Sequence, residues 1–322
     1  MRKMLLLLSM WLSNEALAFP SNIRFGYPTC AACHINPTGG GVLTPYGRST
    51  LTEVMTTWSY EGEEELLWGL FKPSKRIDVG ASARWLELPE QGFLMAREAE
   101  VAMNYKRTIY GVVSGGVYGR DQFQDSLRHY IMSTDQKSIW FKAGRFFPAY
   151  GIMSNEHFML YRGRHFNEGR ETYNAEVIYR GQWFEAAGSK IFGHPKDKEQ
   201  GFVTNGFTGR LLLMPPKARL STGFSVLGLV DKEGKLQTHP AFSFLWGPIK
   251  QLEFEAQAGK EDVYGRVSIE PYQGFSVKPT AQWVYNSDAR FSLVLEWLPR
   301  PHFDMQMIFE DQRYIFQYHF YI

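Results

Sequence analysis

From Arg76 to the C-terminus the chain alternates apolar and polar residues with a period of two, and this feature constrains the fold most strongly. Successive side chains of a strand point to opposite faces of a sheet, so the alternation predicts strands with one apolar and one polar face. About sixteen such segments, most of them near ten residues long, predict an all-β antiparallel fold. The predicted strands cover residues 76–88, 93–106, 108–119, 127–134, 137–147, 171–180, 182–192, 203–214, 217–229, 238–247, 250–259, 262–270, 273–285, 289–298, 301–310 and 313–322.

The connections between these segments favour an outer-membrane β-barrel over a soluble β-sandwich or lipocalin-like barrel. Short turns near residues 106–107 and 180–181 alternate with longer loops such as 148–170, as outer-membrane barrels require. The polar faces carry charges in mid-strand, including Glu98, Glu100, Glu253 and Glu255. Aromatic residues near the strand ends predict a membrane girdle of Trp85, Tyr105, Tyr110, Trp183, Trp246, Trp283 and Trp297.

The first eighteen residues have the pattern of a secretory signal peptide. A basic start precedes an apolar run from Met4 to Leu12, and Ala16-Leu17-Ala18 supplies the small residues of a cleavage site. The apolar run is too short for a membrane-spanning helix. We therefore expect an exported chain whose mature part begins at Phe19, with an uncleaved anchor as the alternative.

The only two cysteines of the chain lie in Cys30-Ala31-Ala32-Cys33-His34, which is the C-x-x-C-H signature of c-type haem attachment. In this chemistry two thiols add to the two vinyl groups of the porphyrin, and the adjacent histidine is an axial ligand of the iron. A thioredoxin-like dithiol would need a βαβ context, a zinc site would need further ligands nearby, and a plain disulfide would leave His34 unexplained.

The residues that follow the motif predict a small segment rather than an independent domain. Three glycines at positions 39–41 allow a sharp turn and a close approach to a flat ligand, and residues 49–71 are expected to be helical. A unit of this size is marginal without further support. We therefore predict three regions: a signal peptide (1–18), a haem c segment (19–75) and a transmembrane β-barrel (76–322) that the segment plugs or caps.

The second axial ligand is the least constrained part of the predicted site. Met55 is the only methionine in the predicted helix and is the candidate ligand, with an ordinary core methionine as the alternative that the residue type favours. His157 and His165 lie in the longest loop, which could fold into the lumen. The parity of the last strand directs His319 toward the lumen, where it is expected to pack, as is His129 on its strand.

A leader, one C-x-x-C-H motif, a brief linker and a sixteen-strand barrel together resemble the fused cytochrome–porin family. The resemblance implies an outer-membrane electron-transfer protein that takes electrons from an extracellular donor such as iron(II). It also implies a periplasmic c-type cytochrome as acceptor, and hence an iron(II):cytochrome oxidoreductase activity. The residue-level match is confined to Cys30, Cys33 and His34. The inference that iron(II) is the substrate therefore comes from the similar architecture alone.

Two other functions are compatible with the same sequence. One is a diffusion porin whose haem plug senses redox state or small ligands, and the other is a periplasmic haem protein with a soluble β-domain. A net charge of +2 without a basic run gives no indication of a nucleic-acid partner.

Overall fold

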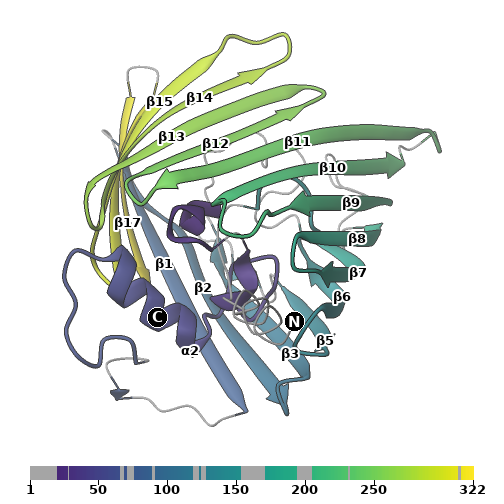
Figure 1. Ribbon diagram of the computed structural model, residues 1–322, viewed down its shortest axis with the longest axis horizontal. Helices are drawn as coiled ribbons and strands as arrows, with labels where there is room; N and C mark the ends of the chain where they lie inside the picture. The colour runs from purple at the N-terminus through teal and green to yellow at the C-terminus, as the bar shows by residue number, and fades with distance from the viewer. Residues whose placement is uncertain are drawn as a thin grey trace, which may run out of the picture.

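The computed structural model of the chain is a ring of antiparallel strands with the N-terminal residues inside it (Figure 1). The structure describes residues 20–27, 29–65, 69–70, 76–88, 91–118, 123–124, 128–153, 171–193, 205–230, 233–310 and 313–322. The strands are β1 (Ile77–Leu88), β2 (Gln91–Tyr105), β3 (Ile109–Tyr118), β4 (Phe123–Gln124), β5 (His129–Thr134), β6 (Ile139–Phe146), β7 (Thr172–Arg180), β8 (Phe184–Gly193), β9 (Gly206–Leu213), β10 (Leu220–Val230), β11 (Leu236–Ile249), β12 (Leu252–Gly259), β13 (Asp262–Tyr272), β14 (Phe275–Val284), β15 (Arg290–Arg300), β16 (Phe303–Glu310) and β17 (Arg313–Tyr321).

The ring closes because β1 pairs with β17, with Ser82 opposite Tyr321 and Glu87 opposite Phe316. The short strand β4 and the strand β5 both pair with β3, so these two of the seventeen strands share one position in the wall. The described residues therefore form a closed barrel with sixteen wall positions, which confirms the predicted fold. A barrel of this size leaves a lumen wider than wall side chains alone can fill.

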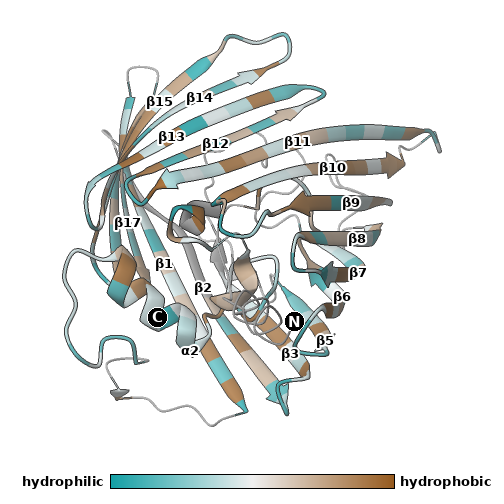
Figure 2. Ribbon diagram, viewed as in Figure 1, coloured by the Kyte–Doolittle hydropathy of each residue, from teal (hydrophilic) through white to brown (hydrophobic). Residues whose placement is uncertain are grey.

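The wall has its apolar face outside and its polar face inside. Ile131, Phe224 and Phe242 are more than half exposed on the exterior. Lumen-facing residues in alternate positions are buried and polar, as Figure 2 shows by the bands along the strands. Examples of the buried polar residues are Glu100, Lys142, Glu176, Arg210, Glu253, Glu255 and Arg266. A water-soluble barrel would show the opposite pattern, so this arrangement matches a lipid-facing exterior.

Most of the predicted aromatic girdle is exposed, but two of its members have other roles. Trp85, Tyr105, Trp183, Trp246 and Trp283 are exposed on the exterior. The prediction was wrong for Tyr110, which packs with a lumen cluster that includes Val42 and Tyr130. Trp297 is half-buried because it packs edge-on against Trp58, and its Nε1 donates a hydrogen bond to Thr57 (3.0 Å).

Within the described residues, the predicted helix over residues 49–71 is present only as far as Met55. The N-terminal elements are η1 (Pro20–Phe25), η2 (Cys30–Ala32), α2 (Pro45–Thr50) and η3 (Leu51–Met55), and the last of these ends at Met55. From Thr56 the chain is extended, because the backbone N–H groups of Thr57 and Trp58 donate to the carbonyls of Leu298 and Pro299. Tertiary hydrogen bonds to the barrel rim thus replace the local helical ones.

Residues 20–65 occupy the short-turn end of the barrel. Ile35 and Val42 pack with Phe146 and its lumen neighbours. At the rim, Arg24 forms an ion pair with Glu270, and Arg300 Nε donates to Glu63 Oε1 (3.0 Å). The segment therefore lies in the lumen and over its mouth, as a plug or cap requires.

None of the helices in the described part of the chain combines the length and the apolar character needed to cross a membrane.

Substituting an exterior residue tests whether the apolar face meets lipid. Phe224 lies in the middle of β10 and is 55% exposed. We expect Phe224→Arg to lower the free energy of unfolding by about 2–4 kcal/mol, because a guanidinium near the bilayer midplane loses its hydration. Urea titration in lipid vesicles measures this change. Gln237→Arg, at an exposed strand end, is the control and should change little; equal effects at both positions would contradict a lipid-facing exterior.

Candidate functional site

The C-x-x-C-H motif folds as one tight turn. The backbone N–H groups of Cys33 and His34 both donate to the carbonyl of Cys30, at 3.2 and 3.0 Å. In a 3-10 turn, side chains three residues apart project on the same side. The turn η2 therefore presents the thiols of Cys30 and Cys33 together, and all three motif residues are buried. The two cysteines are not joined by a disulfide.

The glycines after the motif turn the chain back over it. Gly39, Gly40 and Gly41 have φ values of 89°, 75° and 67°, a backbone region that other residues rarely adopt. A Cβ atom on Gly39 would lie only 3.0 Å from Cys30 Sγ. The returning strand then pairs Leu43 with His34. The predicted sharp turn is thus confirmed, with the backbone in contact with the first thiol.

Helix α2 holds the second half of the motif. The backbone N–H of Thr44 donates to the Cys33 carbonyl (2.8 Å), and the Thr44 hydroxyl donates to the Ala32 carbonyl (2.8 Å). The same hydroxyl accepts from the N–H of Gly47 (3.0 Å) and so caps the helix. A Cβ atom on Gly47 would lie 2.8 Å from the Cα of Cys33, so only glycine fits this contact.

Charged lumen residues fix the segment to the barrel wall. The backbone N–H of Val42 donates to Glu100 Oε1 (3.0 Å), and Glu100 faces Arg128 at 3.5 Å. Lys142 Nζ lies 3.4 Å from Thr38 Oγ1 and 3.1 Å from Glu176 Oε1, with no exposed surface. Glu100, one of the mid-strand charges singled out in the sequence, is therefore a buried anchor for the N-terminal segment. Glu255 faces Arg266 at 3.7 Å, and the side chain of Glu98 lies outside the described residues.

Burial shifts the pKa values of two residues of the motif, in opposite directions. Burial lowers the pKa of His34 to about 4, although interactions with the backbone of Gly40 and Gly41 raise it in part. The imidazole is therefore neutral at physiological pH, which is the form that binds a metal. Burial also raises the pKa of the Cys33 thiol to about 11, and the neighbouring Cys30 adds to this shift.

A second segment enters the lumen from the opposite side, between β6 and β7. The backbone N–H of Ala149 donates to Glu176 on β7, and the next amides reach farther across the barrel. Gly151 donates to Ser225 on β10 (3.1 Å), and Ile152 donates to Gln257 on β12 (2.8 Å). The described part of the long loop thus folds into the lumen and crosses it.

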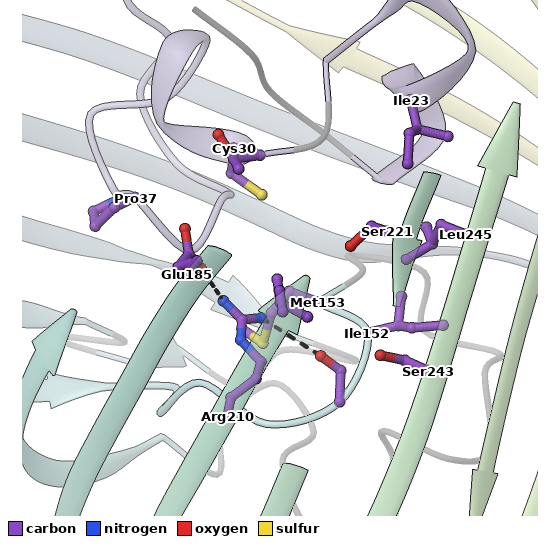
Figure 3. A pocket seen from close by; sticks show the side chains of 13 residues that line it. Ile23, Cys30, Pro37, Ile152, Met153, Glu185, Arg210, Ser221, Ser243 and Leu245 are labelled. Carbon is purple, nitrogen blue, oxygen red and sulfur yellow. Dashed lines mark hydrogen bonds and ion pairs between the residues drawn. The ribbon is translucent and has the colours of Figure 1, made fainter. Parts of the chain in front are cut away.

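A small cavity of about 30 Å³ lies between this crossing segment and the motif (Figure 3). This volume is far below that of ligand-binding pockets. Cys30 lines it from the N-terminal segment, and Met153 and Arg210 line it from the crossing segment and β9. Ile152 and Leu245 supply apolar surface. The donor set of Cys30, Cys33 and His34 fits covalent haem attachment, but this cavity is lined by Cys30 alone of the three and is too small to hold a porphyrin ring.

The structure brings together Cys30, Cys33 and His34 in one turn. Met55 is half-buried at the end of η3, next to Thr56, whose carbonyl accepts from Gln273 at the rim (2.9 Å). His157 and His165 lie outside the described residues.

The two strand histidines pack against neighbours, as expected. His319 faces the lumen and is hydrogen-bonded to Asp304 (2.9 Å), and His129 contacts the hydroxyl of Tyr173 (3.1 Å). Within the described residues, no group of three or more His, Cys, Asp or Glu side chains could hold a metal ion.

Sequence reasoning missed Arg210 and Met153, which line the same cavity as Cys30. The alternation of residues along β9 directs Arg210 to the lumen, so its direction could be predicted from the sequence. Its ion pair with Glu185 could not. Met153 belongs to the long loop, and only the hydrogen bonds of Gly151 and Ile152 place it below the motif.

The solved structures that resemble this one are porin barrels. A variant of the Rhodopseudomonas blastica porin aligns with a TM-score of 0.58 at 7% identity, covering 76% of this chain and all of the porin. Another variant of that porin gives 0.55 at 8% identity, with the same coverage of both chains. At this identity the likeness concerns the fold alone. No protein-family model and no curated protein matches the sequence.

The contact between Gly47 and Cys33 gives a test of the site. We expect Gly47→Ala to push α2 away from the motif and to lower the free energy of unfolding by about 1–3 kcal/mol, as overpacking does. In protein refolded without haem, Cys33 should then react faster with maleimide. Gly111→Ala is the control, because no heavy atom lies within 4 Å of its added Cβ. Equal labelling of the two variants would contradict this packing.

Proposed function

We propose that the chain is an outer-membrane electron-transfer protein with one haem c, covalently attached to Cys30 and Cys33 and ligated by His34. The observation that carries the proposal is the burial of the motif inside the ring, where one tight turn holds two thiols and a neutral imidazole. Residues 1–18 are then the signal peptide, residues 19–75 the haem segment and residues 76–322 the transmembrane barrel.

The two ends of the barrel suit two different partners. The short turns, the start of β1 and the end of β17 all lie on one side of the barrel. In outer-membrane barrels the short turns face the periplasm. Residues 20–65 are at that end, where a periplasmic c-type cytochrome would collect the electron. The long-loop end would face an extracellular donor such as iron(II), which loses one electron and becomes iron(III).

The haem supplies one-electron redox chemistry when it is bound, and its potential depends on axial ligands, hydrogen bonding and burial. The chain supplies the dry surroundings: Ile35 and Val42 pack with the wall residues, and Lys142 and Glu176 form a buried ion pair beside them. Met55 remains the predicted second axial ligand. Met153 lines the same cavity as Cys30 and is a second methionine to test as the axial ligand.

The experiment is expression in a host with haem-attachment machinery, followed by titration with iron(II). We expect one covalent haem per chain and its reduction by iron(II), followed at the haem absorption bands. Cys30→Ala and Cys33→Ala should lower the covalent haem content, whereas His129→Ala should not, because His129 contacts Tyr173 on the wall. A purified chain without covalent haem, or a haem that no external donor reduces, would contradict the proposal.

A diffusion porin is the second candidate, and the likeness to the Rhodopseudomonas blastica porin favours it. Planar-bilayer conductance separates the two functions. We expect a low conductance, because residues 20–65 occupy one end of the lumen and the segment through residue 153 crosses it. A stable conductance comparable with that of an open porin would support the second candidate and contradict an insulated conduit.

A further inference from the structure

The side chain of Glu100 on β2 reaches from the barrel wall to the glycine turn that follows the motif. Its Oε1 accepts from the backbone N–H of Val42 (3.0 Å). A Cβ atom added to Gly41 would collide with that same oxygen, so the carboxylate is packed directly against the turn. Glu100 is buried in this position. The wall therefore holds the turn at two successive residues.

The backbone that Glu100 holds is the one against which His34 rests. Leu43 pairs with His34 in an isolated β-bridge, so the two stretches of chain run side by side. The imidazole also interacts with the backbone of Gly40 and Gly41, in a way that favours its protonated form. A metal-ligating histidine is commonly oriented by a contact of this kind, and the groups behind that contact tune the metal. Glu100 therefore acts on His34 through the glycine turn.

Arg128, directly before β5, brings a positive charge to the same place. Its Nε faces Glu100 Oε2 at 3.5 Å, and both side chains are largely buried. The positive charge of Arg128 also acts on His34, where it opposes protonation. Charges enclosed by protein act more strongly on their surroundings than charges in water. The pair thus affects His34 through the position of the turn and through its two charges.

We propose that Glu100 and Arg128 are positioning residues for the axial histidine, in which the carboxylate fixes the glycine turn against His34 and the guanidinium sets the charge beside it. The inference rests on the proposed ligation of haem by His34. It assigns to two wall residues, on β2 and before β5, a part in setting the haem potential. The barrel is then more than a container for the segment, because its own side chains adjust the site.

The haem potential separates the charges of the pair from its structural role. The full chain is expressed with haem-attachment machinery as wild type, Glu100→Gln and Arg128→Gln, and each midpoint potential is measured by spectroelectrochemical titration. We expect Arg128→Gln to shift the potential downward and Glu100→Gln to shift it upward. A positive charge near the iron disfavours the oxidised haem, and a negative charge favours it. A purely structural pair would not give shifts of opposite sign.

The position of the turn is measured without haem. The full chain carrying Cys30→Ser is refolded without haem, and Cys33 is labelled with maleimide. We expect Glu100→Ala to make labelling about tenfold faster, because the segment loses a hydrogen bond to a charged group. Glu100→Gln keeps an oxygen that can accept from the N–H of Val42, so it should label nearly as slowly as the chain with Glu100.

Glu255→Gln and Arg266→Gln are the matched controls. Glu255 and Arg266 form a buried pair of the same kind (3.7 Å) on β12 and β13, in the opposite half of the ring. Both controls should leave the potential and the labelling rate close to their wild-type values. Heat-modifiable migration on gels shows whether each variant has formed the barrel, so loss of folding is recognised before the other measurements are compared.

The outcomes distinguish this inference from the proposed function. If the wild-type chain carries covalent haem but Arg128→Gln and Glu100→Gln do not shift its potential in opposite directions, the inference is overturned and the proposed function stands. If the wild-type chain carries no covalent haem, the proposed function fails. Faster labelling in Glu100→Ala, with slow labelling restored in Glu100→Gln, then still supports Glu100 as the residue that positions the turn, and equal labelling in all variants overturns it.

Discussion

The pairing of β1 with β17 closes the sheet, and this closure dictates what the rest of the chain must do. In a lipid-facing wall every backbone polar group needs a partner within the protein, and a closed ring supplies one at each strand. The ring also encloses a lumen with a polar surface. Any segment inside it has to satisfy both its own backbone groups and the charges of the wall.

Both inserted segments meet this requirement in the same way. The backbone N–H of Val42 donates to Glu100, and the backbone N–H groups of Ala149 and Ile152 donate to Glu176 and Gln257. Lumen side chains thus act as acceptors for irregular backbone that has no strand neighbour. The cavity lies where the two segments approach each other, so its lining comes from widely separated parts of the sequence.

The wall could be predicted from the sequence because its signal is local. Each strand shows its two faces within about ten residues, and all sixteen predicted segments correspond to strands. The helix over residues 49–71 failed because the N–H groups of Thr57 and Trp58 bind carbonyls some 240 residues away. Arg210 could be directed to the lumen, but its place beside Cys30 depends on loop and segment contacts with no local signature.

The buried motif needs a lumen that excludes water around it, and an open pore does not provide this. His34 and Cys33 are shielded by the glycine turn and by α2, and Gly47 is small enough to let the helix reach the backbone of Cys33. A wide water path beside these groups would remove the burial that lowers the pKa of His34 and raises the pKa of the Cys33 thiol. A lumen that buries the motif therefore cannot also let solutes diffuse freely through it. The contacts of Val42, Thr38 and Ile152 with the wall favour burial of the motif.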